Sequence, residues 1–272
     1  MPAIYGDDLA YVQIAGFGAM AQAVGPQVVA LLHEQGIRGG TIGDVGCGAG
    51  ITTRCFLDAG FNVWALEQSA ALLLAARALA PEAAYLPLGS AYEASLPPSD
   101  AIVAIGEVLN YHAPESDADE RLRGFILRGA KALRPGGILA FDVIVRGDAS
   151  LDGRNWSAGE DWAVLVETRE QPDGWLRCEI ETFVRRGDGY RRGHETHYVR
   201  VFDPEAQRRA ARRGLRCADL GVLARLSGRP ATLCIPMPAD ERRVLSHPQR
   251  SVTDGLRLRR KAQPSRCLHM GN

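Results

Sequence analysis

The sequence predicts an α/β protein in which an open, doubly wound parallel sheet is followed by an antiparallel insert. Between residues 41 and 144, short apolar segments alternate with helical segments, the order that right-handed crossovers in a parallel sheet produce. After residue 144 the segments become longer and are separated by glycine-containing turn signals, as is typical of antiparallel strands. With 272 residues, 46% of them hydrophobic, the chain can bury a substantial core.

The first part of the chain predicts helices. Residues 9–35 place apolar side chains at helical spacing. Pro26 is expected to divide them into two helices, because a proline inside a helix removes a backbone hydrogen bond and clashes with the preceding turn. No uninterrupted apolar run reaches the roughly 18–20 residues of a membrane span, and the start of the chain does not look like a secretory signal. We therefore expect a cytoplasmic protein with no membrane partner.

Five short, mostly apolar segments then predict parallel strands that are buried on both faces. They are residues 41–45, 62–66, 84–88, 101–105 and 138–144. Helices are expected between them, at residues 51–59, 69–80 and 116–133. Ser69 is a good N-cap for the second of these helices. The RPGG segment at 134–137 combines helix-stop and turn signals ahead of the last strand.

Three longer segments predict a three-stranded antiparallel insert after the fifth strand. They are residues 162–170, 175–184 and 190–202. The sequences PDG at 172–174 and GDG at 187–189 separate them, and both are strong turn signals. Asp203 and Pro204 then open another helix, which Gly214 closes.

The formal net charge of zero conceals an uneven distribution. Residues 204–272 carry 15 basic and 5 acidic side chains, whereas residues 1–203 carry 17 and 27. A basic end can mark a nucleic-acid-binding tail, but this one lacks interleaved aromatic side chains, so we expect no nucleic-acid partner. The six cysteines are scattered without a CxxC pair, which argues against a zinc site and against a disulfide framework.

The segment Asp44–Gly50 (DVGCGAG) is the strongest chemical signal in the chain, and it joins the first strand to a helix. Its glycines, Gly46, Gly48 and Gly50, allow a sharp turn and the close approach of a ligand. The helix that follows offers unpaired N–H groups to an anionic carboxylate. Glu67 ends the second strand, where a doubly wound fold places the acid that binds the hydroxyl pair of a ribose.

The spacing of these glycines argues against a dinucleotide. The dinucleotide fingerprint is G-x-G-x-x-G, whereas this loop reads G-x-G-x-G with Asp44 two residues ahead of it. That acid would repel a pyrophosphate but not the ammonium group of S-adenosylmethionine, which also has a carboxylate and a ribose and has no phosphate. S-adenosylmethionine is therefore the expected cofactor, and a nicotinamide-dependent oxidoreductase is the less favoured alternative.

At these motifs the chain resembles the class I S-adenosylmethionine-dependent methyltransferases. The matching segments are DVGCGAG (44–50), VWALE (63–67), LPLGSAYEASLPPSDAIVAIGEVLNY (86–111) and ALRPGGILAFDVI (132–144). The resemblance implies a Rossmann-like doubly wound sheet and transfer of a methyl group to an oxygen or nitrogen of a small-molecule acceptor. An antiparallel insert is typical of some small-molecule members. A protein that binds S-adenosylmethionine without catalysis is a second alternative.

The resemblance also implies roles for individual residues around the cofactor. Asp44 and the glycine loop would hold the methionine part, Glu67 the ribose hydroxyls, and Ser90 and Ala91 would border the adenine. Many members have an acid where Ser90 stands, so that contact is weaker here. The full set of implied cofactor-binding residues is Asp44, Gly46, Cys47, Gly48, Gly50, Glu67, Gln68, Ser90, Ala91, Gly106 and Glu107. Cys47 reads as a small filler that contributes its backbone N–H.

The acceptor end is expected after the fourth strand, where the binding crevice of a doubly wound sheet lies. Asn110 is a candidate substrate contact and Tyr111 a candidate orienting group. His112 is the candidate catalytic base, because its unperturbed pKa is closest to neutrality. Tyr5 and Tyr11, near the start of the chain, are expected to cover the cofactor and contact the substrate. Alternatively the acceptor loses its proton to water, and positioning alone drives the reaction.

His194 and His197 look like a metal pair, but alternation along a strand directs them to opposite faces, so no bound metal is expected. The resemblance suggests instead that Glu195 and His197 support the insert as a lid. The expected partner is a small-molecule methyl acceptor, and the sequence leaves the oligomeric state open, with a homodimer among the alternatives.

Five parts of the chain follow from this reading. They are N-terminal helices at 1–36, a cofactor-binding α/β core at 37–145, the antiparallel insert or lid at 146–202, a divergent end of the core fold at 203–246, and a tail at 247–272. The tail is expected to be poorly ordered, because it has no hydrophobic period and its basic side chains lack nearby acids.

Overall fold

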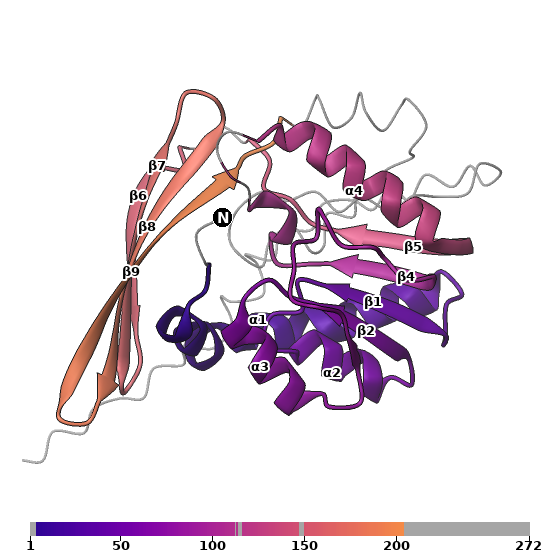
Figure 1. The fold of residues 1–272 in the computed structure, drawn as a ribbon, viewed down its shortest axis with the longest axis horizontal. Helices are drawn as coiled ribbons and strands as arrows, with labels where there is room; N and C mark the ends of the chain where they lie inside the picture. The colour runs from indigo at the N-terminus through magenta and orange to yellow at the C-terminus, as the bar shows by residue number, and fades with distance from the viewer. Residues whose placement is uncertain (1–3, 112, 114–115, 147–149, 204–272) are drawn as a thin grey trace, which may run out of the picture.

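A five-stranded parallel sheet and a four-stranded antiparallel sheet make up the fold (Figure 1). The computed structural model describes residues 4–111, 113, 116–146 and 150–203. The parallel sheet has the order β3-β2-β1-β4-β5, so the chain winds outwards in both directions from β1 and β4. Ligands of such sheets bind at the carboxyl ends of these two strands. The strands are β1 (Thr41–Val45), β2 (Asn62–Leu66), β3 (Ala84–Tyr85), β4 (Ser99–Ala104) and β5 (Leu133–Phe141).

Helices cover both faces of the parallel sheet. They are α1 (Asp7–Glu34), α2 (Ile51–Asp58), α3 (Ala70–Leu79) and α4 (Ala118–Ala132), with a single 3-10 turn, η1 (Val108–Asn110), after β4. Val28 of α1 and Phe56 of α2 pack on one face of the sheet, and Leu122 and Phe125 of α4 pack on the other. The strands are therefore buried on both sides, as their apolar sequences predict.

The first helix is continuous, so the expected division at Pro26 is wrong. Val24 and Val28, on either side of the proline, are both buried in the core, and this packing outweighs the cost of the proline. The side-chain amide of Gln27 also donates to the carbonyl oxygen of Ala23 in the adjoining turn, at 2.9 Å. By length and composition α1 could cross a membrane; here it packs against the insert at its start and against the core at its end.

The insert contains the three expected strands and one more. It has the order β6-β7-β8-β9, with β6 (Gly153–Ala158), β7 (Trp162–Glu170), β8 (Trp175–Arg186) and β9 (Gly189–Arg200), all antiparallel. The additional edge strand, β6, reads GRNWSA and is largely exposed, so it lacks the apolar alternation that marks the others. The fold class predicted from the sequence, a class I-type doubly wound sheet with an antiparallel insert, is confirmed.

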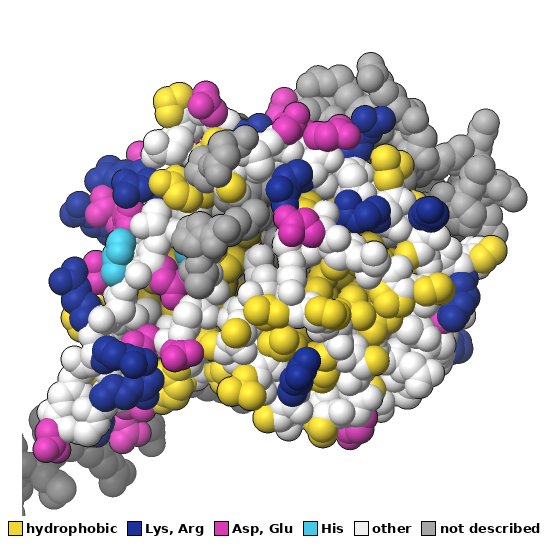
Figure 2. All heavy atoms as spheres, in the orientation of Figure 1, with side chains coloured by type: hydrophobic (Ala, Val, Ile, Leu, Met, Phe, Trp, Pro, Cys, Tyr) yellow, Lys and Arg dark blue, Asp and Glu magenta, His cyan; other side chains and the backbone are white. Residues whose placement is uncertain are grey.

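The insert stands at the carboxyl edge of the parallel sheet, as its position after β5 predicts (Figure 1). Tyr111, just after η1, forms a bridge with Val199 of β9, and Val145, beyond β5, forms one with Phe202. The outer surface of the insert carries interleaved basic and acidic side chains (Figure 2), including pairs such as Arg192–Glu181 at 2.6 Å. These exposed pairs add little to stability but keep that surface polar.

Two strands of the parallel sheet, β3 and β5, differ most from their expected bounds. The third strand has only two residues instead of the expected 84–88. The fifth strand begins at Leu133, directly after α4. The RPGG segment bulges out of it, because Ser99 pairs with Leu133 while Ala101 pairs with Ile138. The turn predicted from this segment is therefore a β-bulge within β5, and Gly136 in it has a φ of 80°.

The helix expected from Pro204 to Gly214, the divergent end of the core fold from residue 204 onwards, and the tail at 247–272 lie outside the described residues.

Candidate active site

A sharp turn after β1 brings the backbone to the candidate site. Gly46, Gly48 and Gly50 have φ angles of 71°, 56° and 83°, which glycine adopts without strain. The amides of Gly46 and Cys47 donate to the carbonyl oxygen of Leu66 at 2.7 and 3.1 Å, so the turn is fastened to the end of β2. The N–H of Cys47 is thus used inside the protein, which corrects the expectation that it is offered to a ligand.

Asp44 lies behind this turn. Its Oδ2 accepts hydrogen bonds from the hydroxyls of Thr52 at 2.8 Å and Thr53 at 2.6 Å, and the residue is only 3% exposed. Burial raises the pKa of Asp44 to about 6, although the two threonine hydrogen bonds act in the opposite direction. The residue expected to hold the methionine part therefore fixes the first turn of α2 to the end of β1.

Glu67 organises the backbone on the opposite side of the turn. Its Oε2 accepts from the amide of Gly48, and its Oε1 accepts from the amides of Gln68 and Ser69, all at 2.8 Å. Burial raises the pKa of Glu67, while these three amides lower it. Oε2 receives one amide, so it has a lone pair left for a further donor, as the binding of a ribose hydroxyl requires.

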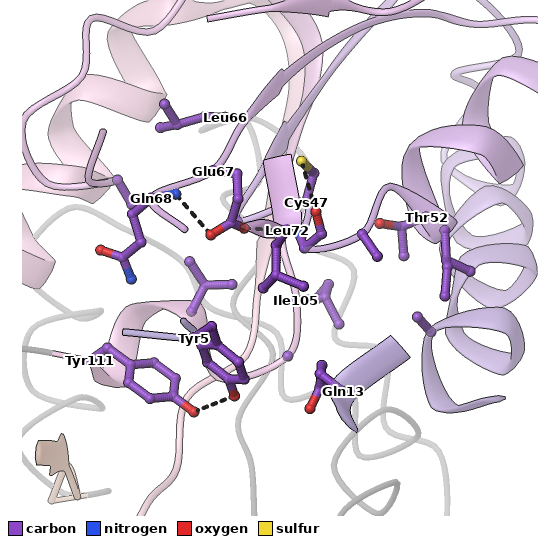
Figure 3. A pocket seen from close by; sticks show the side chains of 18 of the residues that line it. Tyr5, Gln13, Cys47, Thr52, Leu66, Glu67, Gln68, Leu72, Ile105 and Tyr111 are labelled. Carbon is purple, nitrogen blue, oxygen red and sulfur yellow. Dashed lines mark hydrogen bonds between the residues drawn. The ribbon is translucent and has the colours of Figure 1, made fainter. Parts of the chain in front are cut away.

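These elements enclose a cavity of about 160 Å³ (Figure 3). It lies between the glycine turn, the first residues after β2 and the helix α1. Ten of the residues expected in the site line it: Tyr5, Gly46, Cys47, Gly48, Glu67, Gln68, Ser90, Ala91, Gly106 and Tyr111. Two of the glycines leave room for a ligand. A side-chain carbon built on Gly48 or on Gly106 meets nothing within 4 Å, so the space beside both backbones is open.

The cavity suits S-adenosylmethionine better than a phosphate-bearing cofactor. Among the described residues that line it, Glu67 is the sole charged side chain, and no lysine or arginine is present to neutralise a phosphate. An acid placed beside a glycine-rich turn fits a ligand with a ribose, an ammonium and a sulfonium group. Ser90 also lines the cavity, and its hydroxyl accepts from the amide of Tyr92 at 3.2 Å and can still donate.

Two tyrosines close one end of the cavity. The hydroxyls of Tyr5 and Tyr111 point toward each other at 3.1 Å (Figure 3), and the ring of His197 lies 5.3 Å from that of Tyr5 and 5.7 Å from that of Tyr111. Burial raises the pKa of Tyr5 to about 12 and raises that of Tyr111 well above its usual value. Both hydroxyls therefore stay protonated at any working pH.

Five of the expected residues do not line the cavity. Asp44 lies behind the glycine turn, Gly50 packs against Ala76 of α3, and Glu107 follows the lining residue Gly106. The hydroxyl of Tyr11 donates to Asp161 of the insert at 2.6 Å.

Asn110 is fully buried, and its amide group bonds to the backbone of Ile144 and Arg200, so it joins the core to the insert. The expectation that Asn110 faces the substrate is therefore corrected. His112 lies outside the described residues.

Sequence reasoning missed two parts of the site, and it named Glu195 as a support of the lid without finding its partners. Gln13, Ile14 and Phe17 of α1 line the cavity, although their helical spacing gives no sign of which face meets a ligand. Asp142, after β5, accepts hydrogen bonds from the loop that follows β4. Glu195 of β9 accepts from the amides of Tyr5 and Gly6, 190 and 189 residues away in the chain.

The two histidines of β9 do face opposite ways. The side chain of His194 is 51% exposed and pairs with Glu179, whereas that of His197 is 2% exposed and pairs with Glu195. Among the residues that the structure describes, no group of histidine, cysteine, aspartate and glutamate side chains could hold a metal ion.

Comparisons with known proteins agree with this geometry. Residues 43–141 match the family model described as "Methyltransferase domain". DesVI of Streptomyces venezuelae is similar in structure, with a TM-score of 0.71 and 21% identity over 85% of this chain and 98% of DesVI. No curated protein sequence matches the chain.

Two further structures share the fold. The sugar N-methyltransferase KedS8 of Streptoalloteichus sp. has a TM-score of 0.68 and 20% identity, covering 88% of this chain and 98% of KedS8. CalS10 of Micromonospora echinaspora, an amino pentose methyltransferase solved with S-adenosylmethionine bound, has a TM-score of 0.65 and 20% identity, covering 80% of this chain and 92% of CalS10.

The domain match, the doubly wound fold and the cavity identify an enzyme that uses S-adenosylmethionine as its methyl donor. The cavity lies at the carboxyl ends of β1 and β4, from which the sheet winds in both directions. Residues 43–141 form a methyltransferase domain, and the chain has the fold of the class I S-adenosylmethionine-dependent methyltransferases. The nicotinamide alternative is thereby set aside.

Proposed function

We propose that this enzyme transfers the methyl group to a small-molecule acceptor through an oxygen or a nitrogen, and that an amine nitrogen is the better supported of the two. The observation that carries this proposal is the tyrosine pair at the end of the cavity, surrounded by acids. Burial is the main cause that raises the pKa of Tyr5, and the negative charges of Glu107, Glu67 and Glu195 each raise it further. Such surroundings favour a cation, which an amine acceptor is before it loses its proton.

The names of two structural neighbours support the same choice. KedS8 is described as a sugar N-methyltransferase and CalS10 as an amino pentose methyltransferase. Both act on small molecules that carry an amine. The position of the insert beside Tyr111 supports a pocket that is shaped for a compact acceptor.

S-adenosylmethionine supplies an electrophilic methyl carbon on its sulfonium. The chain's own contribution is to position the acceptor, since an in-line approach at about 3 Å can supply roughly 7–11 kcal/mol. One hydroxyl of the Tyr5–Tyr111 pair donates to the other. The pair therefore keeps one proton to donate and an oxygen lone pair to accept a hydrogen bond from the methyl acceptor. Because neither tyrosine ionises, the pair orients the acceptor and does not remove its proton.

Proton removal is proposed to fall to His112, as the sequence predicts, or to water. The pH profile of turnover in His112→Gln separates the two, because loss of a base would remove the acidic limb of the profile. The cytoplasmic location stays a prediction. The sequence leaves the oligomeric state open, with a homodimer among the alternatives, and light scattering of the purified protein decides it.

Calorimetric titration with S-adenosylmethionine and with NADH, followed by a screen of amino sugars and other small amines, tests the proposal. We expect binding of S-adenosylmethionine alone, and a product whose mass has increased by one methyl group. Methylation of hydroxyl compounds with no amine accepted would refute the choice of nitrogen. Tight cofactor binding with no acceptor in any class would favour a protein that binds the cofactor without catalysis.

A further inference from the structure

Two non-glycine residues of the described chain have a left-handed backbone, and both stand at the cavity. Tyr5 has a φ of 54° and Glu107 a φ of 64°. Tyr5 lines the cavity, and Glu107 follows Gly106, which lines it. A non-glycine residue in this region costs free energy and persists only where its surroundings hold it, and such residues gather at functional sites.

A carboxylate from a distant element holds each of these residues in the same way. Oδ1 of Asp142, just beyond β5, accepts from the amides of Gly106 at 3.0 Å and Glu107 at 2.9 Å. Oε2 of Glu195 on β9 accepts from the amide of Tyr5 at 2.8 Å, and its Oε1 accepts from Gly6 at 2.9 Å. In both cases two successive amides converge on one carboxylate, the arrangement by which a backbone concavity binds an anion.

We propose that Asp142 and Glu195 are positioning residues for methyl transfer: by accepting these paired amides they hold Gly106 and Tyr5 in the conformations that line the cofactor cavity. The inference rests on the proposed methyl-transfer function. Without Asp142 the amides of Gly106 and Glu107 lose the oxygen that accepts their hydrogen bonds, and the strained backbone of Glu107 loses this support. Without Glu195 the segment that carries Tyr5 loses its attachment to the insert.

The electrostatic surroundings agree with such a role. Burial raises the pKa of Asp142 to about 6, and the amides of Glu107 and Gly106 lower it. Burial would also raise the pKa of Glu195, but hydrogen bonds from His197 and from the amides of Gly6 and Tyr5 hold it below its usual value. At both positions the two backbone amides lower the pKa of the carboxyl group and so stabilise its charged form.

The two carboxylates differ in how many of their oxygens accept from the backbone amides, and this difference can be tested by substitution. Asp142 uses one oxygen for both amides, so the amide oxygen of Asp142→Asn can replace it. Glu195 uses both oxygens, so Glu195→Gln must turn an NH2 group toward one of the two amides. Alanine removes every acceptor at either position.

Calorimetric titration with S-adenosylmethionine measures the effect, with thermal denaturation as a check on folding. We expect Asp142→Ala to lose affinity by roughly tenfold or more, Asp142→Asn to stay within about threefold of the wild type, and Glu195→Gln to lie between them. Asp100→Ala is the matched control, because Asp100 accepts from the amide of Thr41 at 2.7 Å at the opposite edge of the sheet. It should lower stability and leave affinity unchanged.

Asp142→Asn and Asp142→Ala with equal losses would overturn the inference, since the charge and not the paired acceptors would then matter. Wild-type affinity in Asp142→Ala would overturn it as well. A wild-type protein that does not bind S-adenosylmethionine would refute the proposed function itself, so the two failures are distinguishable. If the alanine variants do not fold, the two amide variants alone decide, because the inference requires Asp142→Asn to bind more tightly than Glu195→Gln.

Discussion

The contacts of Glu67 allow its contribution to be separated into a structural part and a ligand-binding part. Replacement by glutamine keeps the size of the side chain. Its amide oxygen can keep the bonds from Gln68 and Ser69, but its NH2 group then faces the N–H of Gly48, which now donates to Oε2 at 2.8 Å. A buried amide without an acceptor costs about 1–3 kcal/mol, so the free energy of unfolding should fall by about that amount.

Cofactor affinity should fall in parallel. Glu67→Ala removes the acceptor for the ribose hydroxyls, and we expect a loss of about 1–3 kcal/mol in binding, on the order of 10–100-fold. Glu67→Gln should lose a similar amount, because the oxygen that remains already accepts from the amides of Gln68 and Ser69. Gly48→Val should lose more than either, since its side chain would enter the open space beside the turn. Titration calorimetry with S-adenosylmethionine measures all three variants.

The result that refutes this reasoning is specific. If Glu67→Ala binds S-adenosylmethionine as tightly as the wild type, the cofactor does not lie against the end of β2, and the assignment of the cavity is wrong. If affinity falls but the free energy of unfolding is unchanged, the three amides have found other acceptors. Glu67 then binds the cofactor without stabilising the fold.

Further predictions concern turnover and stability. Tyr5→Phe and Tyr111→Phe should each lower turnover roughly tenfold with an unshifted pH profile, because neither hydroxyl titrates; steady-state kinetics from pH 6 to about 10 measures this. The raised pKa of Asp44 means that its stabilising effect is present below its unfolded value of 3.8 and is lost as pH rises through about 6. Asp44→Asn should therefore raise stability at pH 8 relative to pH 5 by about 1.4 kcal/mol in urea unfolding, and an unchanged difference would contradict the assigned shift. Gly43→Ala should destabilise by about 1–3 kcal/mol, because its side chain would overlap the Trp64 ring; a wild-type urea midpoint would show that the ring moves freely.

The core of the fold could be predicted because its signals are local. Each strand of the parallel sheet is a short apolar segment, and the turn after β1 needs glycine at three positions of positive φ. Glu67 stands where the second strand ends, a position that chain order alone defines. These features depend on neighbours within a few residues, so one sequence is enough to find them.

Other features depend on packing that the sequence does not reveal. Pro26 indicates a break, yet the buried side chains on either side of it keep α1 continuous. The strand β6 is recognisable only through its pairing with β7, because its own residues are mostly polar and exposed. Asn110 looks like a ligand contact by its position after β4, but its amide group matches the backbone of two elements that approach from far along the chain.

The end of the cavity that Tyr5 and Tyr111 close depends on contacts between residues far apart in the chain. The start of the chain is held by the insert at three places: the backbone of Tyr5 and Gly6 bonds to Glu195, Asp8 pairs with Arg191 at 2.6 Å, and Tyr11 donates to Asp161. The insert and the first turns of α1 therefore act as one structural unit, although more than 140 residues separate them.

This arrangement has a consequence for specificity. The core sheet supplies the glycine turn and Glu67, the proposed cofactor contacts. Tyr5 is held at the cavity by Glu195 and the ring of His197 of the insert, and by the hydroxyl of Ser69, which donates to its carbonyl oxygen. Changes in β9 that keep Glu195 can therefore alter this end of the cavity while the glycine turn and Glu67 stay in place. Acceptor choice in this enzyme should accordingly follow the sequence of β9 and of the first residues of α1 more closely than that of the glycine turn.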